Sequence, residues 1–242
     1  MPIKSKCLIL FIFLIIYVNY GLAYEDNYTF ELKTLTRQLP EDVWRLYTTK
    51  PDVSYLEYGS LAAASSLILL DQELYDIFHQ SSLRDFHGWE VISIFGEPVL
   101  YGLLGLAYAT NDHPLGEDLL YSVGFAGANT FVLKFTVGMA RPYLNEGIHF
   151  IGPHLQSDYA AFPSGHTATA FSAATVFSEY YPEYAGWFWT GASLVGLSRI
   201  YLEKHWPSNV VFGAILGYLS AKHALEVRKH SKPYIHNCEV ND

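Results

Sequence analysis

Long apolar segments rich in Gly and Ala constrain the fold of this chain more than any other feature. They span residues 54–70, 91–110, 115–139, 167–181, 184–202 and 208–227, with a more polar helical segment at 72–87. None of them alternates strictly between apolar and polar residues, as a half-buried strand would. The sequence therefore predicts an all-α fold, a helical bundle of about six core helices.

The N-terminus has the pattern of a secretory signal. Lys4 and Lys6 precede an apolar run at 7–18, and small residues lead up to Ala23. This order predicts a signal peptide at 1–23, cleaved after Ala23. An uncleaved anchor is the alternative, although a spanning helix needs about 20 apolar residues. In both cases we expect an exported chain, either at the cell membrane with a site facing the periplasm or exterior, or soluble in the periplasm or secreted.

The remainder divides into a lead-in, a domain and a tail. Residues 24–53 are polar and mixed, with Pro40 as a helix breaker and a short amphipathic helix expected at 41–47. Residues 54–227 form the predicted helical domain. A basic tail follows at 228–242.

The amino-acid composition indicates which kinds of partner the chain can bind. Charged residues make up only 16% of the chain, against about 25% in typical soluble domains. The net charge of −9 argues against a nucleic-acid partner. Gly and Ala crowd the helices, as in membrane helix packing, and we expect membrane association. A soluble, tightly packed bundle is the alternative, because the charge-free runs are mostly shorter than a spanning helix requires.

Two cations lie on one face of an apolar helix. Lys134 and Arg141 are seven residues apart, about two helical turns. Unpaired buried charge is unfavourable, so this pair predicts an anionic partner. Snorkelling side chains or separate ion pairs would explain the same residues.

A second polar cluster is Pro163-Ser164-Gly165-His166, just before an apolar helix. Ser164 is an N-cap residue and Gly165 allows close approach of the backbone. Free N–H groups and the helix dipole at this point favour an anion, above all a phosphate. His166 falls in the first turn. An ordinary helix start explains this stretch equally well when it is taken alone.

The third cluster surrounds the start of the last helix. Arg199 ends one apolar helix, His205 lies in the connection, and Asn209 follows in the first turn of the next, within reach of His205. Structural roles as a helix-end charge, a satisfied histidine and a cap are the alternatives. Together the three clusters suit phosphoryl transfer: cations bind phosphate oxygens, one histidine can attack phosphorus and the other can protonate the leaving oxygen.

The order and spacing of these clusters resemble the three-part signature of the type 2 phosphatidic acid phosphatase superfamily. That superfamily also includes bacterial acid phosphatases and vanadium haloperoxidases. K-x6-R-P matches at 134–142, PSGH at 163–166 and S-R-x5-H at 198–205. The haloperoxidase branch fits a short, exported chain poorly.

The resemblance implies both a reaction and roles. His205 would be the nucleophile that forms a phospho-histidine, and His166 the general acid. The phosphate would be held by Lys134, Arg141, Ser164, Gly165 and Arg199. The implied substrates are phosphate monoesters or lipid phosphates such as phosphatidic acid, a prenyl diphosphate or lipid A. No metal or other cofactor is implied for the phosphatase branch, and vanadate is expected to inhibit by occupying the pocket.

Asn209 departs from the family pattern, which has Asp there. The amide oxygen can still accept a hydrogen bond from the His205 ring, but it carries no negative charge. Three explanations stay open: an enzyme with reduced or compensated activity, a non-catalytic phosphate-binding or lipid-phosphate-binding pseudoenzyme, or a deliberately inactivated variant. His149 and His154, in the loop between the first two motifs, are weak candidates for a metal site.

Overall fold

A computed structural model describes residues 32–52, 54–111 and 113–231; the expected signal segment lies outside the described residues. The α-helices are α2 Leu32–Thr48, α3 Tyr55–Ser66, α4 Asp71–His79, α5 Trp89–Ile94, α6 Pro98–Thr110, α7 Pro114–Val137, α8 Gly165–Tyr180, α9 Ala185–Tyr201 and α10 Pro207–Ser231. Short 3-10 turns lie at Leu67–Leu70, Ser82–Asp85, Pro142–Leu144, Ser157–Tyr159 and Pro182–Tyr184. The all-α prediction is confirmed; in the described ranges the only strand-like pairing is one bridge, between Met139 and Phe150.

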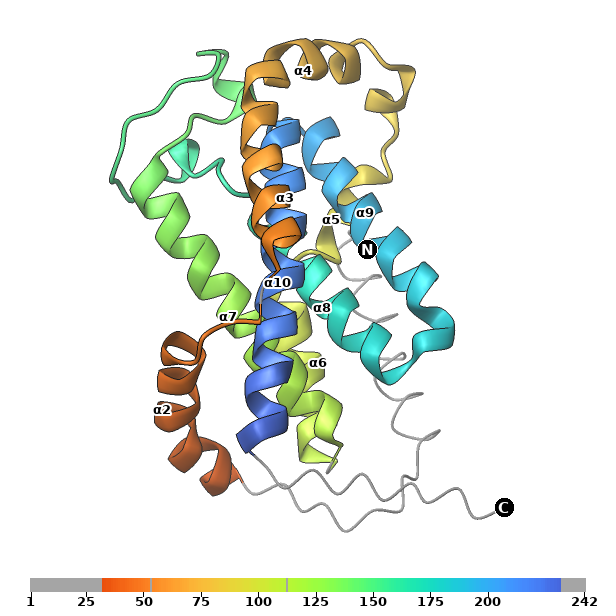
Figure 1. The fold of residues 1–242 in the computed structure, drawn as a ribbon. Helices are drawn as coiled ribbons and strands as arrows, with labels where there is room; N and C mark the ends of the chain where they lie inside the picture. Colours follow the sequence, from red (N-terminus) through yellow and green to blue (C-terminus); the bar gives the residue numbers. More distant parts are fainter. Residues whose placement is uncertain (1–31, 53, 112, 232–242) are drawn as a thin grey trace.

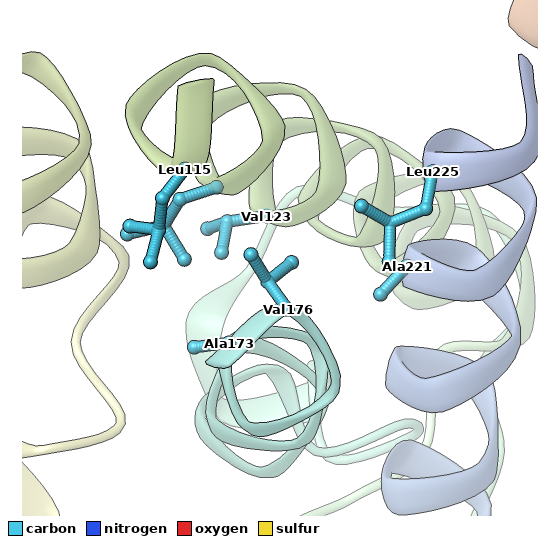
Figure 2. Packing of buried hydrophobic residues seen from close by; sticks show 7 residues of the cluster. Leu115, Val123, Ala173, Val176, Ala221 and Leu225 are labelled. Atoms are coloured by element: carbon cyan, nitrogen blue, oxygen red, sulfur yellow. The ribbon is translucent and has the colours of Figure 1, made fainter. Parts of the chain in front are cut away.

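Helices α7, α8 and α10 form the centre of the bundle (Figure 1). Their facing side chains make one apolar cluster, in which each helix contributes residues from a single side (Figure 2). The labelled members are Leu115 and Val123 of α7, Ala173 and Val176 of α8, and Ala221 and Leu225 of α10. Alanines at the contacts let the helix backbones approach closely, so the three helices are held in one arrangement.

Proline and serine set several helix starts. Pro98, Pro114 and Pro207 occupy the first turns of α6, α7 and α10, where a missing N–H is harmless. Ser54 caps α3 in a reciprocal capping box with Glu57. Local signals therefore determine where these helices begin.

The segment expected as one helix at 91–110 is two helices. Its break follows from Pro98, which disfavours helical backbone in the residue before it. Glu97 accordingly adopts an extended conformation at the N-cap of α6. The break places Glu97 at a bend between α5 and α6 instead of on a helix flank.

Helix α2 is longer than the expected segment at 41–47, and Pro40 lies inside it instead of ending it. A proline within a helix removes one backbone hydrogen bond, so tertiary contacts must hold this helix together. His223 of α10 contributes one such contact, since its Nε2 lies 2.9 Å from the carbonyl oxygen of Leu46.

Helix α10 continues to Ser231 instead of ending at residue 227. The reason is Arg228, which is buried and not part of a solvated tail. Its Nη2 donates to Glu117 Oε2 at 2.6 Å, and its Nε donates to Asp118. The two acidic residues at the start of α7 therefore pair with the last turn of α10. Breaking such a buried pair from one side is strongly destabilising.

One helix among the described residues, Pro207–Lys229, has the length and composition to cross a membrane. Half of its apolar window is buried inside the bundle. The core helix of a soluble protein has the same length and composition.

The contact between α8 and α10 gives a test of the packing. A Cβ added to Gly217 would lie 2.1 Å from the Ala168 carbonyl oxygen, whereas one added to Gly124 of α7 meets nothing within 4 Å. We expect Gly217→Ala to lower the free energy of unfolding by about 1–3 kcal/mol. The control Gly124→Ala should be neutral or stabilise by up to about 1 kcal/mol. Thermal unfolding followed by circular dichroism measures both; equal melting of the two variants would contradict the packing described here.

Candidate active site

The three sequence clusters meet at one end of α7, α8 and α10. The backbone N–H of Ser164 donates to the carbonyl oxygen of Asn209 at 3.0 Å, which joins the start of α8 to the start of α10. Gly165 lies beside the first cluster, since a Cβ there would be 3.6 Å from Lys134 Cε. Residues more than 70 positions apart in the chain thus line one site.

Three cations are gathered there. Burial, followed by repulsion from Arg141 and Arg199, lowers the pKa of Lys134 to about 7. Burial and the charge of Arg141 lower the pKa of Arg199 to about 10. Arg199 is buried, and within the described ranges its Nε has no hydrogen-bond partner. Like charges held this close favour an anion between them.

Backbone carbonyl groups hold two of these cations in place. Lys134 Nζ donates to the Ala160 oxygen. Arg141 Nε donates to the Ser157 oxygen at 2.9 Å. Both carbonyls belong to the loop that precedes α8, so this loop fixes where positive charge is presented. The sequence motif indicates the two cations, whereas the backbone carbonyls that hold them have no sequence signal.

Ser164 begins α8 as expected. Its Oγ accepts from the Thr167 hydroxyl at 2.8 Å and from the Thr167 N–H at 3.5 Å. The side chain is fully buried. Because the Thr167 hydroxyl donates in this pair, the proton of Ser164 Oγ is not used there. Ser164 is therefore a helix cap that keeps one donor for another group.

His205 is buried, at 2% exposure. Its Nδ1 lies 2.6 Å from the Ala161 carbonyl oxygen. A carbonyl oxygen can only accept, so Nδ1 carries the proton. Burial and the charges of Lys134, Arg141 and Arg199 hold the pKa of the ring well below its usual value. The ring is therefore neutral, and the lone pair lies on Nε2, for which the described residues provide no hydrogen-bond partner.

Asn209 has partners other than the His205 ring. Its Oδ1 accepts from the Trp206 N–H at 3.1 Å. Its Nδ2 donates to Met139 Sδ and to Ser208 Oγ, both at 3.2 Å. The expected contact between Asn209 and His205 is therefore absent from the described hydrogen bonds. The Ala161 carbonyl contacts the ring instead, and Asn209 caps the start of α10.

A buried carboxylate that sequence analysis missed supports this turn. Asp71, at the start of α4, accepts from the Ser208 N–H at 2.8 Å and from the Ser208 hydroxyl. It is fully buried, and burial raises its pKa above the usual value. The carboxylate lies at the N-terminus of α10, where the helix dipole favours negative charge. In the sequence, Asp71 directly follows the apolar segment 54–70, and nothing there indicates a contact with Ser208.

Two residues that precede the first motif in the sequence also contact the site. His166 Nε2 lies 3.0 Å from Glu97 Oε1. Arg199 Nη1 donates to Ser93 Oγ. Burial and the charge of Arg199 lower the pKa of His166 to about 4, and Glu97 partly offsets this shift. The sequence offered only one hint of these partners, an acidic residue interrupting an apolar run at Glu97.

Metal binding has no cluster to support it in the described residues, where no group of three or more His, Cys, Asp or Glu side chains is suitably placed. The two ring nitrogens of His154 each lie 2.9 Å from a backbone carbonyl, of Gly152 and of Gln156. These contacts are those of a loop-stabilising histidine.

Comparison with protein families identifies this arrangement. Residues 117–232 match the model of the PAP2 superfamily. Over these residues, the chain is similar to the PAP2 superfamily. The matched region contains all three clusters, so the resemblance read from Lys134, His166 and His205 is confirmed at the level of the family.

Curated relatives include two lipid A 1-phosphatases. The chain is 46% identical over 63 residues to the protein of Porphyromonas gingivalis, covering 24% of this chain and 14% of that protein. It is 31% identical over 106 residues to the protein of Rhizobium johnstonii, covering 43% of each. The match therefore spans less than half the length of these two PAP2-type relatives.

A more extended match is the undecaprenyl-diphosphatase of Sulfolobus acidocaldarius, 25% identical over 169 residues, which covers 66% of this chain and 79% of that protein. Among solved structures, Aquifex aeolicus LpxE aligns with a TM-score of 0.54 at 24% identity, covering 65% of this chain and 95% of that one. The structural likeness supports the helical PAP2 fold.

The network around Asn209 predicts the effect of restoring the family carboxylate. Asn209→Asp would bury a second carboxylate against Ser208 Oγ, whose proton already serves Asp71. We expect the free energy of unfolding to fall by about 2 kcal/mol or more at pH 7. The new carboxyl should have a folded-state pKa above its unfolded value of about 3.9. The loss should therefore be small below about pH 4 and grow as pH rises through the folded pKa.

Thermal melts of both proteins between pH 4 and 8 measure this loss. In the combined variant Asp71→Asn with Asn209→Asp, Ser208 again has one amide and one carboxylate as its two side-chain partners. It should recover part of the loss in a double-mutant cycle. Additive effects of the two substitutions, or a loss independent of pH, would contradict the network.

Proposed function

We propose that this chain is a phosphatase that releases inorganic phosphate from a lipid phosphate through a phospho-histidine formed on His205. One observation carries the proposal: a neutral His205 whose lone pair lies on Nε2, beside three cations. A nucleophile must present a lone pair at neutral pH, and the Ala161 carbonyl selects the tautomer that does so.

In the first step, Nε2 of His205 attacks phosphorus and the bond from phosphorus to the ester oxygen breaks. The leaving oxygen takes a proton from His166, so it departs as an alcohol. In the second step, water attacks phosphorus, His166 takes a proton from it, and the bond from phosphorus to nitrogen breaks. Phosphate leaves and both histidines return to their starting states.

The cations suit the charge that develops in these steps. The transferred group carries negative charge on three equatorial oxygens. Lys134, Arg141 and Arg199 surround the position with dispersed positive charge, and Arg199 Nε is free of partners in the described ranges. The N-terminus of α8 adds Ser164 and the Gly165 N–H. A bound phosphate would also relieve the repulsion among the cations.

A lipid as the rest of the substrate is supported by exposed apolar side chains. Val99, Leu103 and Leu106 are exposed at helical spacing on α6, and Phe131 and Phe135 on α7. Exposed apolar patches of this kind mark membrane or ligand contacts. Two relatives also support a lipid substrate, because they are named as a lipid A 1-phosphatase and an undecaprenyl-diphosphatase. We propose membrane association, with the exported orientation expected from residues 1–23.

The activity is tested with p-nitrophenyl phosphate, phosphatidic acid, a prenyl diphosphate and lipid A in detergent micelles. We expect phosphate release, with a higher kcat/KM for a lipid than for p-nitrophenyl phosphate. His205→Ala should lower kcat by about 10³-fold or more, and His166→Ala by about 10²–10⁴-fold. His87→Ala, an exposed histidine outside the site, is the matched control.

The outcomes separate the enzyme from a binding protein. Phosphate binding that disappears in Arg199→Ala, with no turnover of any of these substrates by the unmodified chain, would establish a pseudoenzyme and overturn the proposed activity. Turnover that survives His205→Ala would exclude the phospho-histidine.

Vanadate gives an independent prediction about the pocket. As a five-coordinate mimic of the transferred group, it should compete with substrate and bind at least about 10²-fold more tightly than the substrate's KM. Arg199→Ala should weaken it, since that residue contacts the oxygens in this mechanism. Steady-state inhibition at several substrate concentrations measures this; inhibition that is not competitive would place vanadate elsewhere.

A further inference from the structure

The bend between α5 and α6 touches two groups of the site at once. Ser93, in the last turn of α5, is buried and accepts from Arg199 Nη1. Glu97, at the N-cap of α6, lies with Oε1 at 3.0 Å from His166 Nε2. Both residues come before the matched family region at 117–232. They also come from one five-residue stretch, so a single backbone bend carries both contacts.

The backbone of this bend is pressed against the start of α8. A Cβ added to Gly96 would lie 2.7 Å from His166 Cβ, 2.7 Å from Val195 Cγ1 and 3.0 Å from the His166 carbonyl oxygen. Only glycine fits at that distance. Pro98 then starts α6 and fixes the extended backbone of Glu97. Gly96 and Pro98 therefore hold the Glu97 carboxylate beside His166.

We propose that Ser93, Gly96 and Glu97 form a fourth part of the active site, in which Glu97 positions His166 and Ser93 positions Arg199. The inference rests on the proposed phosphatase function. Glu97 holds Nε2–H of the His166 ring, and Nδ1, which has no hydrogen bond in the described ranges, delivers the proton to the leaving oxygen. After transfer the ring is neutral and keeps its Nε2–H on the carboxylate.

The charges around His166 give Glu97 a second effect. Arg199 of α9 and Lys134 of α7 both disfavour the protonated ring, and Glu97 favours it. A general acid must be protonated to act, so Glu97 raises the protonated fraction of His166 at a given pH. Half of the Glu97 side chain is exposed, so solvent weakens this effect.

Glu97→Gln keeps the shape of the side chain and removes its charge. We expect the alkaline limb of the kcat–pH profile to move down by about 0.5–1 pH unit, with KM nearly unchanged. Glu97→Asp should recover part of the shift. Glu90→Gln, an exposed acidic residue on α5, makes the same charge change away from the site and should leave the profile in place. An unchanged limb in Glu97→Gln, or an equal shift in Glu90→Gln, would overturn the assignment of Glu97.

Ser93→Ala should act on binding and not on protonation. Loss of the hydroxyl frees Arg199, so KM and the inhibition constant for inorganic phosphate should rise about 5–10-fold, while the alkaline limb stays fixed. Ser93→Thr, which keeps the hydroxyl, should leave KM and the inhibition constant for phosphate near those of the unmodified chain. If Ser93→Ala moves neither constant, Ser93 has only a packing role.

An NMR titration separates this inference from the proposed activity. The ring resonances of His166, assigned by comparison with His166→Gln, are followed with saturating inorganic phosphate. The pKa of His166 should be lower in Glu97→Gln than in the unmodified chain, whether or not the chain turns over any substrate. Equal pKa values would overturn the positioning role of Glu97, whereas an inactive chain with a shifted pKa would overturn only the phosphatase.

Discussion

The contact between α8 and α10 is the constraint on which the site depends. Gly217 lets α10 approach Ala168 of α8, and nearer the starts of the two helices the Ser164 N–H reaches the Asn209 carbonyl. That close approach brings the start of α8 next to the segment that carries His205. A bulkier residue at Gly217 would separate two clusters that lie about 40 residues apart in sequence, and the local helix signals could not restore the geometry.

Three like charges at one place are tolerated only because rigid groups surround them. Lys134 and Arg141 are held by carbonyls of the loop before α8, and Arg199 by Ser93. These contacts hold the cations in place without neutralising them, so the electrostatic strain remains available to stabilise an anion. Preorganised charge of this kind is what phosphoryl transfer requires, since little reorganisation is then needed during the reaction.

Sequence alone predicted the start of α8 after Ser164 and of α10 at Pro207, because such signals are local. It also predicted which cations and histidines belong together, because their spacing resembles a known family. It could not predict Ala161, Asp71 or Glu97 as partners, since a backbone carbonyl has no sequence signal and a lone acidic residue has many uses. The residues 91–110 were expected as one helix, although Pro98 was the signal for the break that places Glu97.

An aspartate four residues after His205 would both orient the ring and supply negative charge, and in this chain another group provides the first of these roles. Orientation of the ring comes from the Ala161 carbonyl, which accepts from Nδ1–H and so selects that tautomer. The nearby carboxylate of Asp71 bonds to Ser208 and not to the ring, so the negative charge of the family aspartate has no direct replacement among the described contacts of His205. Asn209 fits the network around Ser208, because its amide donates to Ser208 where a carboxylate would repel Asp71. Since a neutral nucleophile needs the correct tautomer before it needs a counter-charge, Asn209 is compatible with the first chemical step. In the proposed mechanism, phosphorylation makes the His205 ring cationic, and a neutral Asn209 cannot stabilise that charge. Any reduction in rate should therefore be greatest for formation of the phospho-histidine, whose transition state develops the charge.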